Sequence, residues 1–512
     1  MRSVYLLLLF AGIIAVSSCR DDFETTLSTG ELRFSKDTIF LDTVFTNIGS
    51  STFNLKVFND SDEAISIPRV RLGDGEDSNY RLNVDGVPGK TFDNVEILAN
   101  DSIFVFVETT VDIQQAGTTN NQFLYTDQIE FDSGGNQQEV ELVTLVQDAI
   151  FLFADRDETT GIVETLTING VETSLEGRYL TDEELTFTNE RPYVIYGYMA
   201  VGDPDGTTPK TLTMEPGARV HFHADSGIIV ADNGTLAING AISSDEIALE
   251  NEVILEGDRL ETIFSDVPGQ WGTLLLTDGS VNNSINYATI KNATVGILNE
   301  SSIGAGNPNL TISNSQIYNA SAVGLLNRFS SVEGYNTVIN NCGQFSLLVQ
   351  LGGFYNFTHC TFANFWTNSF RSTPAVFLDN TFITDGFDLN ANFVNCIIDG
   401  NQNEEIGFNN NPVAPFNFNF SNSLIRFEDT FGQFEGIPEF DFANGTLYDN
   451  IILNQDADFD DPSQNRLRVG ENTAGNGLGL LNAALAFPID IVGTDRTASP
   501  DLGAYQSIEL PE

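Results

Sequence analysis

A repeat of roughly twenty residues between positions 287 and 427 constrains the fold more than any other feature of this chain. The sequence aligns seven times on one large apolar position, with steps of 27, 22, 23, 21, 15 and 27 residues. These anchors are Ile290, Ile317, Ile339, Phe362, Ile383, Ile398 and Ile425. A recurring period with constant slots is typical of stacked copies of one structural unit.

Two kinds of residue accompany the anchors. A small residue stands two places before each anchor, at Ala288, Ser315, Thr337, Cys360, Thr381, Cys396 and Ser423. Asn recurs three places before, at 314, 336, 380, 395 and 422, and Asn or Asp follows two places after, at 292, 319, 341, 364 and 385. Residues two apart on a strand share one face, so the pattern predicts parallel strands around a narrow core. Because Asn tolerates left-handed backbone, we expect Asn ladders at the corners, with His359 in one Asn slot. An Asn-lined sugar-binding face is the alternative.

The cysteines are predicted to be buried fillers. Cys360 and Cys396 occupy the small slot and should point inward, two coils apart and beyond disulfide reach. Together with Cys342 they leave an odd number after position 19, which argues against a closed disulfide framework. No CxxC motif or nearby His pair accompanies them, so we predict no metal site there.

The first thirty residues indicate export. An apolar run at 4–16 follows Arg2 and is too short to span a bilayer, as in a signal peptide. Val16-Ser17-Ser18-Cys19 resembles a bacterial lipobox, which implies cleavage before Cys19 and acylation of its thiol. An ordinary secretory cleavage site is the alternative. The following acidic segment 20–24 resembles the tag that directs lipoproteins to the outer face of the outer membrane. We therefore expect a lipid anchor in the outer membrane, facing the cell exterior.

The charge balance excludes one class of partner. The chain has 72 acidic and 22 basic residues, a formal net charge of −50. Nucleic acid is excluded as a partner because its phosphates require Lys and Arg. Polyanionic glycans are disfavoured unless calcium bridges the carboxylates. We interpret the acidity as a solubility feature in a salty medium. No cofactor is predicted, and a structural calcium ion stays an alternative without an assigned place.

The N-terminal third predicts a separate domain. Alternating segments at 38–45, 53–59 and 102–108, divided by turn-rich stretches, predict an antiparallel β-sandwich over residues 31–150. The stretch resembles the immunoglobulin-like modules of bacterial surface lipoproteins, although it lacks their Cys…Trp…Cys core.

The remainder resembles a known repeat fold. Segments 211–222, 227–230, 234–240 and 269–276 resemble pectin-lyase-like right-handed β-helices, and Gly503-Ala504-Tyr505-Gln506 resembles their closing motif. We predict an all-β chain: an immunoglobulin-like β-sandwich followed by a right-handed parallel β-helix. The predicted parts are a signal peptide (1–18), a lipidated tether (19–30), the sandwich (31–150), a connecting region (151–198), the β-helix (199–455) and its closing segment (456–512). The fold hosts lyases, hydrolases, adhesins and inert shafts, so the resemblance leaves the activity undecided.

Candidate metal ligands are weak. His221 and His223 would share one face of a strand, but no third ligand accompanies them. Asp456, Asp458, Asp460 and Asp461 match only the opening of an EF-hand loop, since Gly and Glu are missing from its key positions. We predict no metal-ligating residues.

No catalytic constellation emerges either. A lyase needs a base and positive charge, yet between 270 and 427 the basic residues Lys291, Arg328, Arg371 and Arg426 follow no slot. A hydrolase needs paired carboxylates. The nearest group is Asp379, Asp385, Asp388 and Asp399, of which 385 and 399 could meet across adjacent coils, and solvated turn aspartates are the simpler interpretation. We predict no catalytic residues.

Aromatic residues between 354 and 370 are the remaining functional signal. Phe362 is an anchor, whereas Trp366 lies beyond the Asn364 corner, where an exposed ring could stack on a sugar; additional core packing in a wide coil is the alternative. Function is expected on the irregular insertions 300–308, 367–374 and 401–415. The sequence favours a non-catalytic binding or adhesion role, with a carbohydrate or another surface protein as partner. A polysaccharide lyase or glycoside hydrolase is the alternative.

Overall fold

The computed structural model describes residues 24–115, 121–132, 136–300 and 307–510. The chain divides into two compact units, Met1–Asp148 and Ala149–Glu512, and strands dominate both. Cys19, the signal peptide and the start of the tether lie outside the described residues. Within the described ranges, no helix is long and apolar enough to cross a membrane.

The first unit contains two sheets around one apolar core. The six-stranded sheet consists of β1 (Thr26–Leu27), β3 (Thr38–Phe45), β5 (Ile65–Leu72), β8 (Thr91–Ile97), β10 (Gln122–Asp132) and β11 (Gln138–Gln147). The five-stranded sheet consists of β2 (Arg33–Phe34), β4 (Phe53–Asn59), β6 (Tyr80–Val84), β7 (Val87–Gly89) and β9 (Asp101–Thr109). Alternate side chains point inward, so Leu55 and Val105 share a core with Val70 and Leu142 of the other sheet.

The predicted strands of this unit match the structure closely. Segments 38–45 and 53–59 coincide with β3 and β4, and 102–108 lies within β9. Most strand pairs are antiparallel, as expected, whereas β1 pairs with β5 and β3 pairs with β11 in parallel. The alternation of apolar residues therefore located the strands but not the direction of every pairing.

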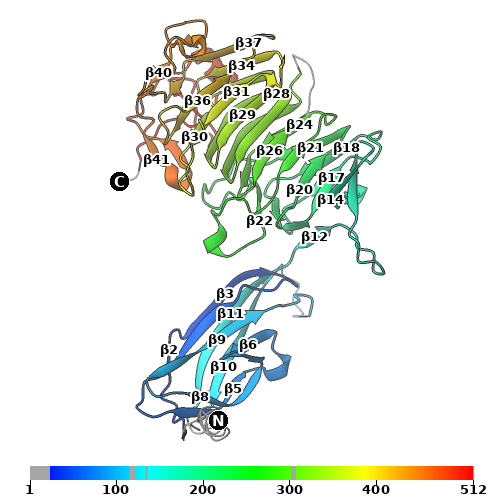
Figure 1. The fold of residues 1–512 in the computed structure, drawn as a ribbon, viewed down its shortest axis with the longest axis vertical. Helices are drawn as coiled ribbons and strands as arrows, with labels where there is room; N and C mark the ends of the chain where they lie inside the picture. The colour runs from blue at the N-terminus through cyan, green and yellow to red at the C-terminus, as the bar shows by residue number, and fades with distance from the viewer. Residues whose placement is uncertain (1–23, 116–120, 133–135, 301–306, 511–512) are drawn as a thin grey trace, which may run out of the picture. The chain divides into compact units, whose positions relative to one another are not determined.

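The second unit is built on one large, mostly parallel sheet of 27 strands (Figure 1). A strand typically pairs with the third strand after it, as in β17–β20–β23–β26 and β18–β21–β24–β27, so three strands make one turn. This large parallel-strand sheet is compatible with a β-helix. Its strands are β12 (Ile150–Phe153), β13 (Thr165–Ile168), β14 (Val171–Tyr179), β15 (Thr186–Phe187), β16 (Tyr193–Tyr196), β17 (Tyr198–Val201), β18 (Lys210–Met214), β19 (Arg219–Phe222), β20 (Gly227–Val230), β21 (Gly234–Asn239), β22 (Val253–Gly257), β23 (Leu274–Leu276), β24 (Asn283–Asn286), β25 (Ala288–Lys291), β26 (Val295–Asn299), β27 (Leu310–Ala320), β28 (Val323–Cys342), β29 (Phe345–Thr358), β30 (Thr361–Asn364), β31 (Val376–Asp379), β34 (Leu389–Val394), β35 (Ile397–Gly400), β36 (Ile406–Asn409), β37 (Phe416–Ser421), β38 (Leu424–Ile425), β39 (Tyr448–Asp449) and β40 (Ile452–Leu453).

The stretch 151–198, predicted as a connecting region, contributes strands to the same sheet. β12 pairs with β16 and β14 pairs with β17, both in parallel. Short strands with polar turns between them hide the repeat at this end, so the slots are not visible in the sequence.

The apolar anchors form one stacked column inside the coil. Ile290 pairs with Ile317, Ile317 with Ile339, and Ile339 with Phe362, and all four are buried. The predicted anchor at Ile383 is wrong, because this residue is 83% exposed beside the hairpin β32 (Thr381–Phe382) and β33 (Asp385–Gly386). Phe362 instead pairs directly with Ile398. An insertion within one long coil had mimicked an additional copy of the repeat.

The same register changes the position of the cysteines. Cys360 and Cys396 lie on adjacent coils, since the residues two places after them are paired, so the predicted separation of two coils is wrong. Both thiols are free and buried, as is Cys342. Burial raises the pKa of Cys396 well above its usual value. These side chains fill the core as expected.

The predicted Asn ladders are confirmed at the corners. Asn314, Asn336, Asn395 and Asn422 have φ between 45° and 55°. Asn336 Nδ2 donates to Asn314 Oδ1 at 2.8 Å, and Asn341 Nδ2 donates to Asn319 Oδ1 at 2.6 Å. His359 takes the predicted place in a ladder, because its Nε2 lies 2.9 Å from Asn395 Nδ2.

The C-terminal segment packs on the outside of the coil. It contains β41 (Phe459–Asp461), β42 (Arg466–Val469) and α2 (Leu481–Ala486). Short 3₁₀ turns elsewhere are Gly75–Asp77, Asp182–Glu184, Thr262–Phe264, Pro438–Phe440 and Pro462–Gln464. Leu467, Ile491 and Leu502 form an apolar cluster with the outward-facing Val338 and Ile397. The predicted closing segment therefore covers a side of the sheet.

Candidate functional site

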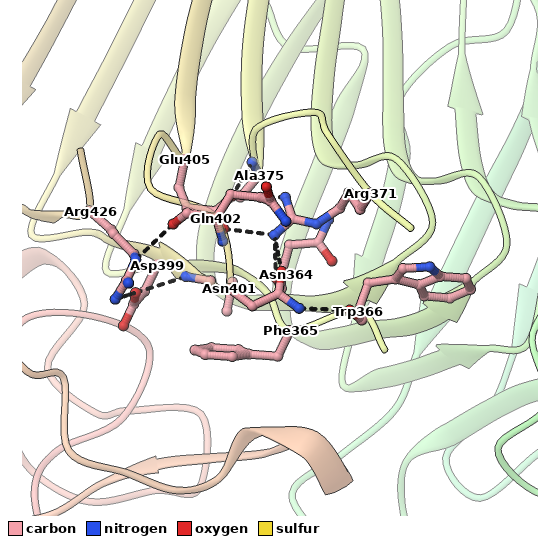
Figure 2. A network of polar contacts seen from close by, with 12 residues as sticks. Asn364, Phe365, Trp366, Arg371, Ala375, Asp399, Asn401, Gln402, Glu405 and Arg426 are labelled. Carbon is pink, nitrogen blue, oxygen red and sulfur yellow. Dashed lines mark hydrogen bonds and ion pairs between the residues drawn. The ribbon is translucent and has the colours of Figure 1, made fainter. Parts of the chain in front are cut away.

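Two of the predicted insertions meet at a buried ion pair. Arg371 belongs to insertion 367–374 and Glu405 to insertion 401–415, which follow the paired strands β30 and β35. Arg371 Nη1 donates to Glu405 Oε2 at 2.9 Å, and Nη2 donates to Oε1 at 2.7 Å (Figure 2). The side chains are 1% and 0% exposed. Buried charges require such paired, hydrogen-bonded geometry.

Further hydrogen bonds connect this pair to both insertions. Arg371 Nη2 also donates to the Asn364 carbonyl at 2.7 Å and to Asn401 Oδ1 at 2.6 Å. The Glu405 carboxylate accepts from the backbone N–H groups of Gln402 at 2.8 Å and Ala375 at 2.7 Å. Figure 2 shows these groups converging between the two loops. The network therefore ties insertion 367–374 to the start of insertion 401–415, just before β36.

Two carboxyl groups near this network have raised pKa values. Burial raises the pKa of Glu405 to about 7, a rise that the bonds with Arg371 limit. Burial raises the pKa of Asp399 to about 6, while the Gly400 N–H and Arg426 oppose that rise. Raised pKa values can mark a general acid, but a catalytic group must also reach its substrate. Glu405 is fully buried, and both of its carboxylate oxygens already accept hydrogen bonds from the two insertions and Ala375. Its role in this geometry is therefore to position the loops.

The fixed loops border a pocket of about 620 Å³. Its walls carry the aromatic rings of Phe377, Phe408, Phe434 and Phe440, the amides of Gln402, Asn409, Asn410 and Gln433, and the carboxyl groups of Glu404 and Glu439. Phe408 and Phe440 have ring centroids 5.1 Å apart. Asn410 Nδ2 donates to Glu439 Oε1 at 2.6 Å. Apolar rings with a few fixed polar groups are typical of a small-molecule binding site.

Trp366, for which sugar stacking and core packing were the alternatives, is buried. It is 6% exposed, and its Nε1 donates to Ser369 Oγ at 2.9 Å. Its carbonyl accepts from Asn401 Nδ2 at 2.6 Å, so it belongs to the support of the network. Of the two alternatives the structure bears out packing, because the insertion contributes Ser369 as the partner of the indole N–H. Of the rings that line the pocket, Phe377 lies in β31 and Phe408 in β36, whereas Phe434 and Phe440 lie between β38 and β39.

The candidate metal ligands are engaged elsewhere. His221 is buried with Nδ1 3.3 Å from the Gly257 carbonyl, and burial lowers its pKa. His223 Nδ1 lies 2.8 Å from Asp258 Oδ2. Asp460 pairs with Arg466, at 2.7 Å between Oδ2 and Nε. Within the part of the chain that the structure describes, no three His, Cys, Asp or Glu side chains gather to hold a metal ion.

Asp385 and Asp399, for which we considered a juxtaposition, belong to different sheets. Asp385 pairs with Phe382 in the small hairpin, and Asp399 pairs with Ala363 in the large sheet. Among the scattered basic residues, Lys291 pairs with Glu256 at 2.8 Å between Nζ and Oε2. Glu405, the partner of Arg371, was missed in the sequence. Its only signal was its place in an insertion, because a buried acid has no local pattern.

Comparison of the sequence with protein families and with curated proteins finds no match. Among solved structures, the chain is similar to the catalytic unit of a GH87 α-1,3-glucanase from Streptomyces thermodiastaticus, at 10% identity and a TM-score of 0.28, over 72% of this chain and 74% of that one. It is also similar to a PapD-like domain of human CEP192, at 12% identity and a TM-score of 0.16, over 26% and 94%. A family 123 glycoside hydrolase from Clostridium perfringens gives 9% identity and a TM-score of 0.16, and 27% of its length is covered. Similarities this weak carry no argument about activity.

Proposed function

We propose that this protein is a cell-surface protein that binds neutral glycans without converting them. The observation that carries the proposal is the pocket that the two insertions border together with β31 and segment 433–440, with its four phenylalanine rings and four amide side chains. Sugar rings present apolar C–H faces that pack on aromatic rings. Their hydroxyl groups match amides, which both donate and accept hydrogen bonds.

Charge favours neutral over acidic glycans. The pocket lining includes Glu404 and Glu439 and contains no Lys or Arg among the described residues. The whole chain has a net charge of −50. A uronate or sulfated chain would enter a negative potential, whereas a neutral chain would not.

The burial of Glu405, the acid of the network, supports a binding role for that residue. Glu405 accepts four hydrogen bonds from Arg371, Gln402 and Ala375 and does not line the pocket. A general acid must lie within hydrogen-bond reach of the bond that it cleaves. Hydrolase or lyase activity stays as an outcome of the test described below.

The architecture fits presentation at a surface. We propose that the parallel sheet is a right-handed β-helix, supported by its three strands per turn and the strong right-handed preference of parallel crossovers. We propose that the first unit is an immunoglobulin-like sandwich that acts as a spacer. Acylation of Cys19 would anchor the chain in the outer membrane, facing the exterior.

The binding proposal is tested by calorimetry with soluble neutral glycans (glucan, mannan and xylan oligosaccharides) and acidic ones (alginate and pectate oligosaccharides). Phe408→Ala should weaken binding of the neutral ligand by about five- to ten-fold, equivalent to about 1–1.5 kcal/mol. Asn410→Ala should also weaken it, and this exposed residue carries little risk to folding. Phe370→Ala is the matched control, because that ring is 89% exposed but does not line the pocket.

Three results would contradict the binding proposal. Release of shortened or unsaturated products would establish catalysis. Preference for the acidic ligands would contradict the charge argument. Equal effects of the pocket variants and Phe370→Ala would place the ligand elsewhere.

The anchor is tested separately with Cys19→Ala. This variant should lose labelling by an alkyne fatty acid and should lose membrane association. Unchanged labelling together with unchanged surface proteolysis would contradict the anchor.

A further inference from the structure

Three large apolar residues adopt left-handed backbone near one corner of the coil. Phe329, Leu351 and Ile383 have φ values of 45°, 62° and 56°. This region is unfavourable for residues with bulky side chains, whereas Asn enters it readily. Most other left-handed positions of the coil's corners hold Asn, as at Asn319 and Asn341 with φ of 56° and 53°, although Tyr287 and His359 are also left-handed. Bulky side chains in strained backbone are found at functional sites more often than at passive turns.

Two of these residues line a second pocket, of about 720 Å³. Its lining residues are Asp278, Glu300, Arg328, Phe329, Gln350, Leu351, Asp379, Thr381 and Phe382. The register shifts where Arg328 pairs with Gln350 but Ser330 pairs with Gly353, which marks a bulge in β29 opposite Phe329. Bulges redirect side chains, and here Phe329 is 45% exposed beside Phe382 at 52%. The strained corner thus presents aromatic surface to solvent.

The floor of this second pocket is polar. Arg328 Nη1 donates to Glu300 Oε1 at 2.8 Å, and Arg328 Nε donates to Gln350 Oε1 at 3.2 Å. With Asp278 and Asp379, carboxylates outnumber the single guanidinium. Carboxylates accept hydrogen bonds from hydroxyl groups and repel anions, so this floor suits a neutral sugar.

The second pocket adjoins the first. Asp379, which lines the second pocket, accepts a 3.0 Å hydrogen bond from Asn409 Nδ2, which lines the first. The second pocket follows five consecutive paired strands, β23, β26, β28, β29 and β31. Of these strands, β26, β28, β29 and β31 are labelled in Figure 1. Four inter-strand spacings of about 4.8 Å make a track of about 19 Å, longer than a single sugar ring.

We propose that the second pocket is a further glycan subsite, and that one extended neutral chain occupies both pockets. This inference rests on the proposed function and specifies its ligand class, an unbranched neutral oligosaccharide longer than a disaccharide. Occupation of both pockets by one chain would make affinity increase with chain length, because the second contact is intramolecular.

The test compares neutral glucan, mannan and xylan ladders of two to six units by calorimetry on the full chain. The six-unit ligand of one ladder should bind about ten-fold or more tightly than its two-unit ligand. Phe329→Asn should abolish that gain without loss of melting temperature, because Asn relieves the left-handed strain while removing the ring. Arg328→Gln, on the floor, should reduce the gain as well.

The outcomes separate the two proposals. If every ladder lacks a length dependence, or if Phe329→Asn leaves it unchanged, the second subsite is overturned while Phe408→Ala still tests the first pocket. If no neutral ligand binds, or if one binds but Phe408→Ala leaves its affinity unchanged, the proposed function fails. The second subsite then fails with it.

Discussion

Replacement of Arg371 by Met should destabilise the second unit strongly. The variant leaves the Glu405 carboxyl buried, with its two backbone donors but without its bidentate partner. Removal of one member of a buried ion pair typically costs about 3–5 kcal/mol. We therefore expect the free energy of unfolding to fall by about that amount at pH 7.

The pH dependence makes this prediction specific. The pKa of Glu405 is about 7 in the folded protein, above its unfolded value of about 4.5. Between those values the folded state binds more protons than the unfolded state, so this group's contribution to stability decreases as pH rises. In Arg371→Met the folded pKa rises further, so the decrease continues above pH 7. The gap between wild type and variant should then widen by about 1.4 kcal/mol per pH unit.

Tryptophan fluorescence during urea unfolding measures this effect in the second unit alone. The chain has two tryptophans, Trp271 and Trp366, and both are buried in that unit. Arg371→Met/Glu405→Gln is the matched control, since the amide cannot ionise and its single oxygen keeps an acceptor for one of the two N–H groups, which donate to different oxygens of Glu405. This double variant should recover part of the lost free energy of unfolding. Its gap from the wild type should not widen as pH rises. A constant gap between pH 7 and 8.5, or a loss below 1 kcal/mol, would refute the reasoning.

Three other perturbations test the ladders and the core. Burial lowers the pKa of His359 to about 2 in the folded protein, from 6.5 in the unfolded chain. Below pH 6.5 the unfolded state binds a proton that the folded state does not, so stability should decrease as pH falls. In His359→Asn the urea midpoint should fall less steeply as pH decreases below 6.5. An unchanged slope would contradict this role of His359. Asn336→Ala should cost about 1–2 kcal/mol and Asn336→Gly less, because the position is left-handed with φ of 48°. Equal losses would point to the hydrogen bonds instead. Cys342, Cys360 and Cys396 should resist alkylation until urea unfolds the coil, and rapid native labelling detected by mass spectrometry would contradict their burial.

Local patterns predicted much of the architecture. Period-two alternation located β3, β4 and β9, because one face of each strand is buried. The small, apolar and Asn slots predicted the stacked column and the corner ladders, since each coil repeats the same local environment. The same counting failed at Ile383, because an insertion carried a chance copy of the slots and only strand register revealed that Phe362 meets Ile398.

The sequence by itself determined that the chain is all-β, repetitive and strongly acidic, and it led us to expect function on the insertions. Those properties follow from residue types and short spacings. Only the tertiary structure decided that Arg371 and Glu405 meet, that Trp366 is buried, and that Phe329 faces solvent from a strained corner. These outcomes depend on which coils become neighbours and how insertions fold back on them. Such contacts join residues far apart in the chain, so no local pattern encodes them.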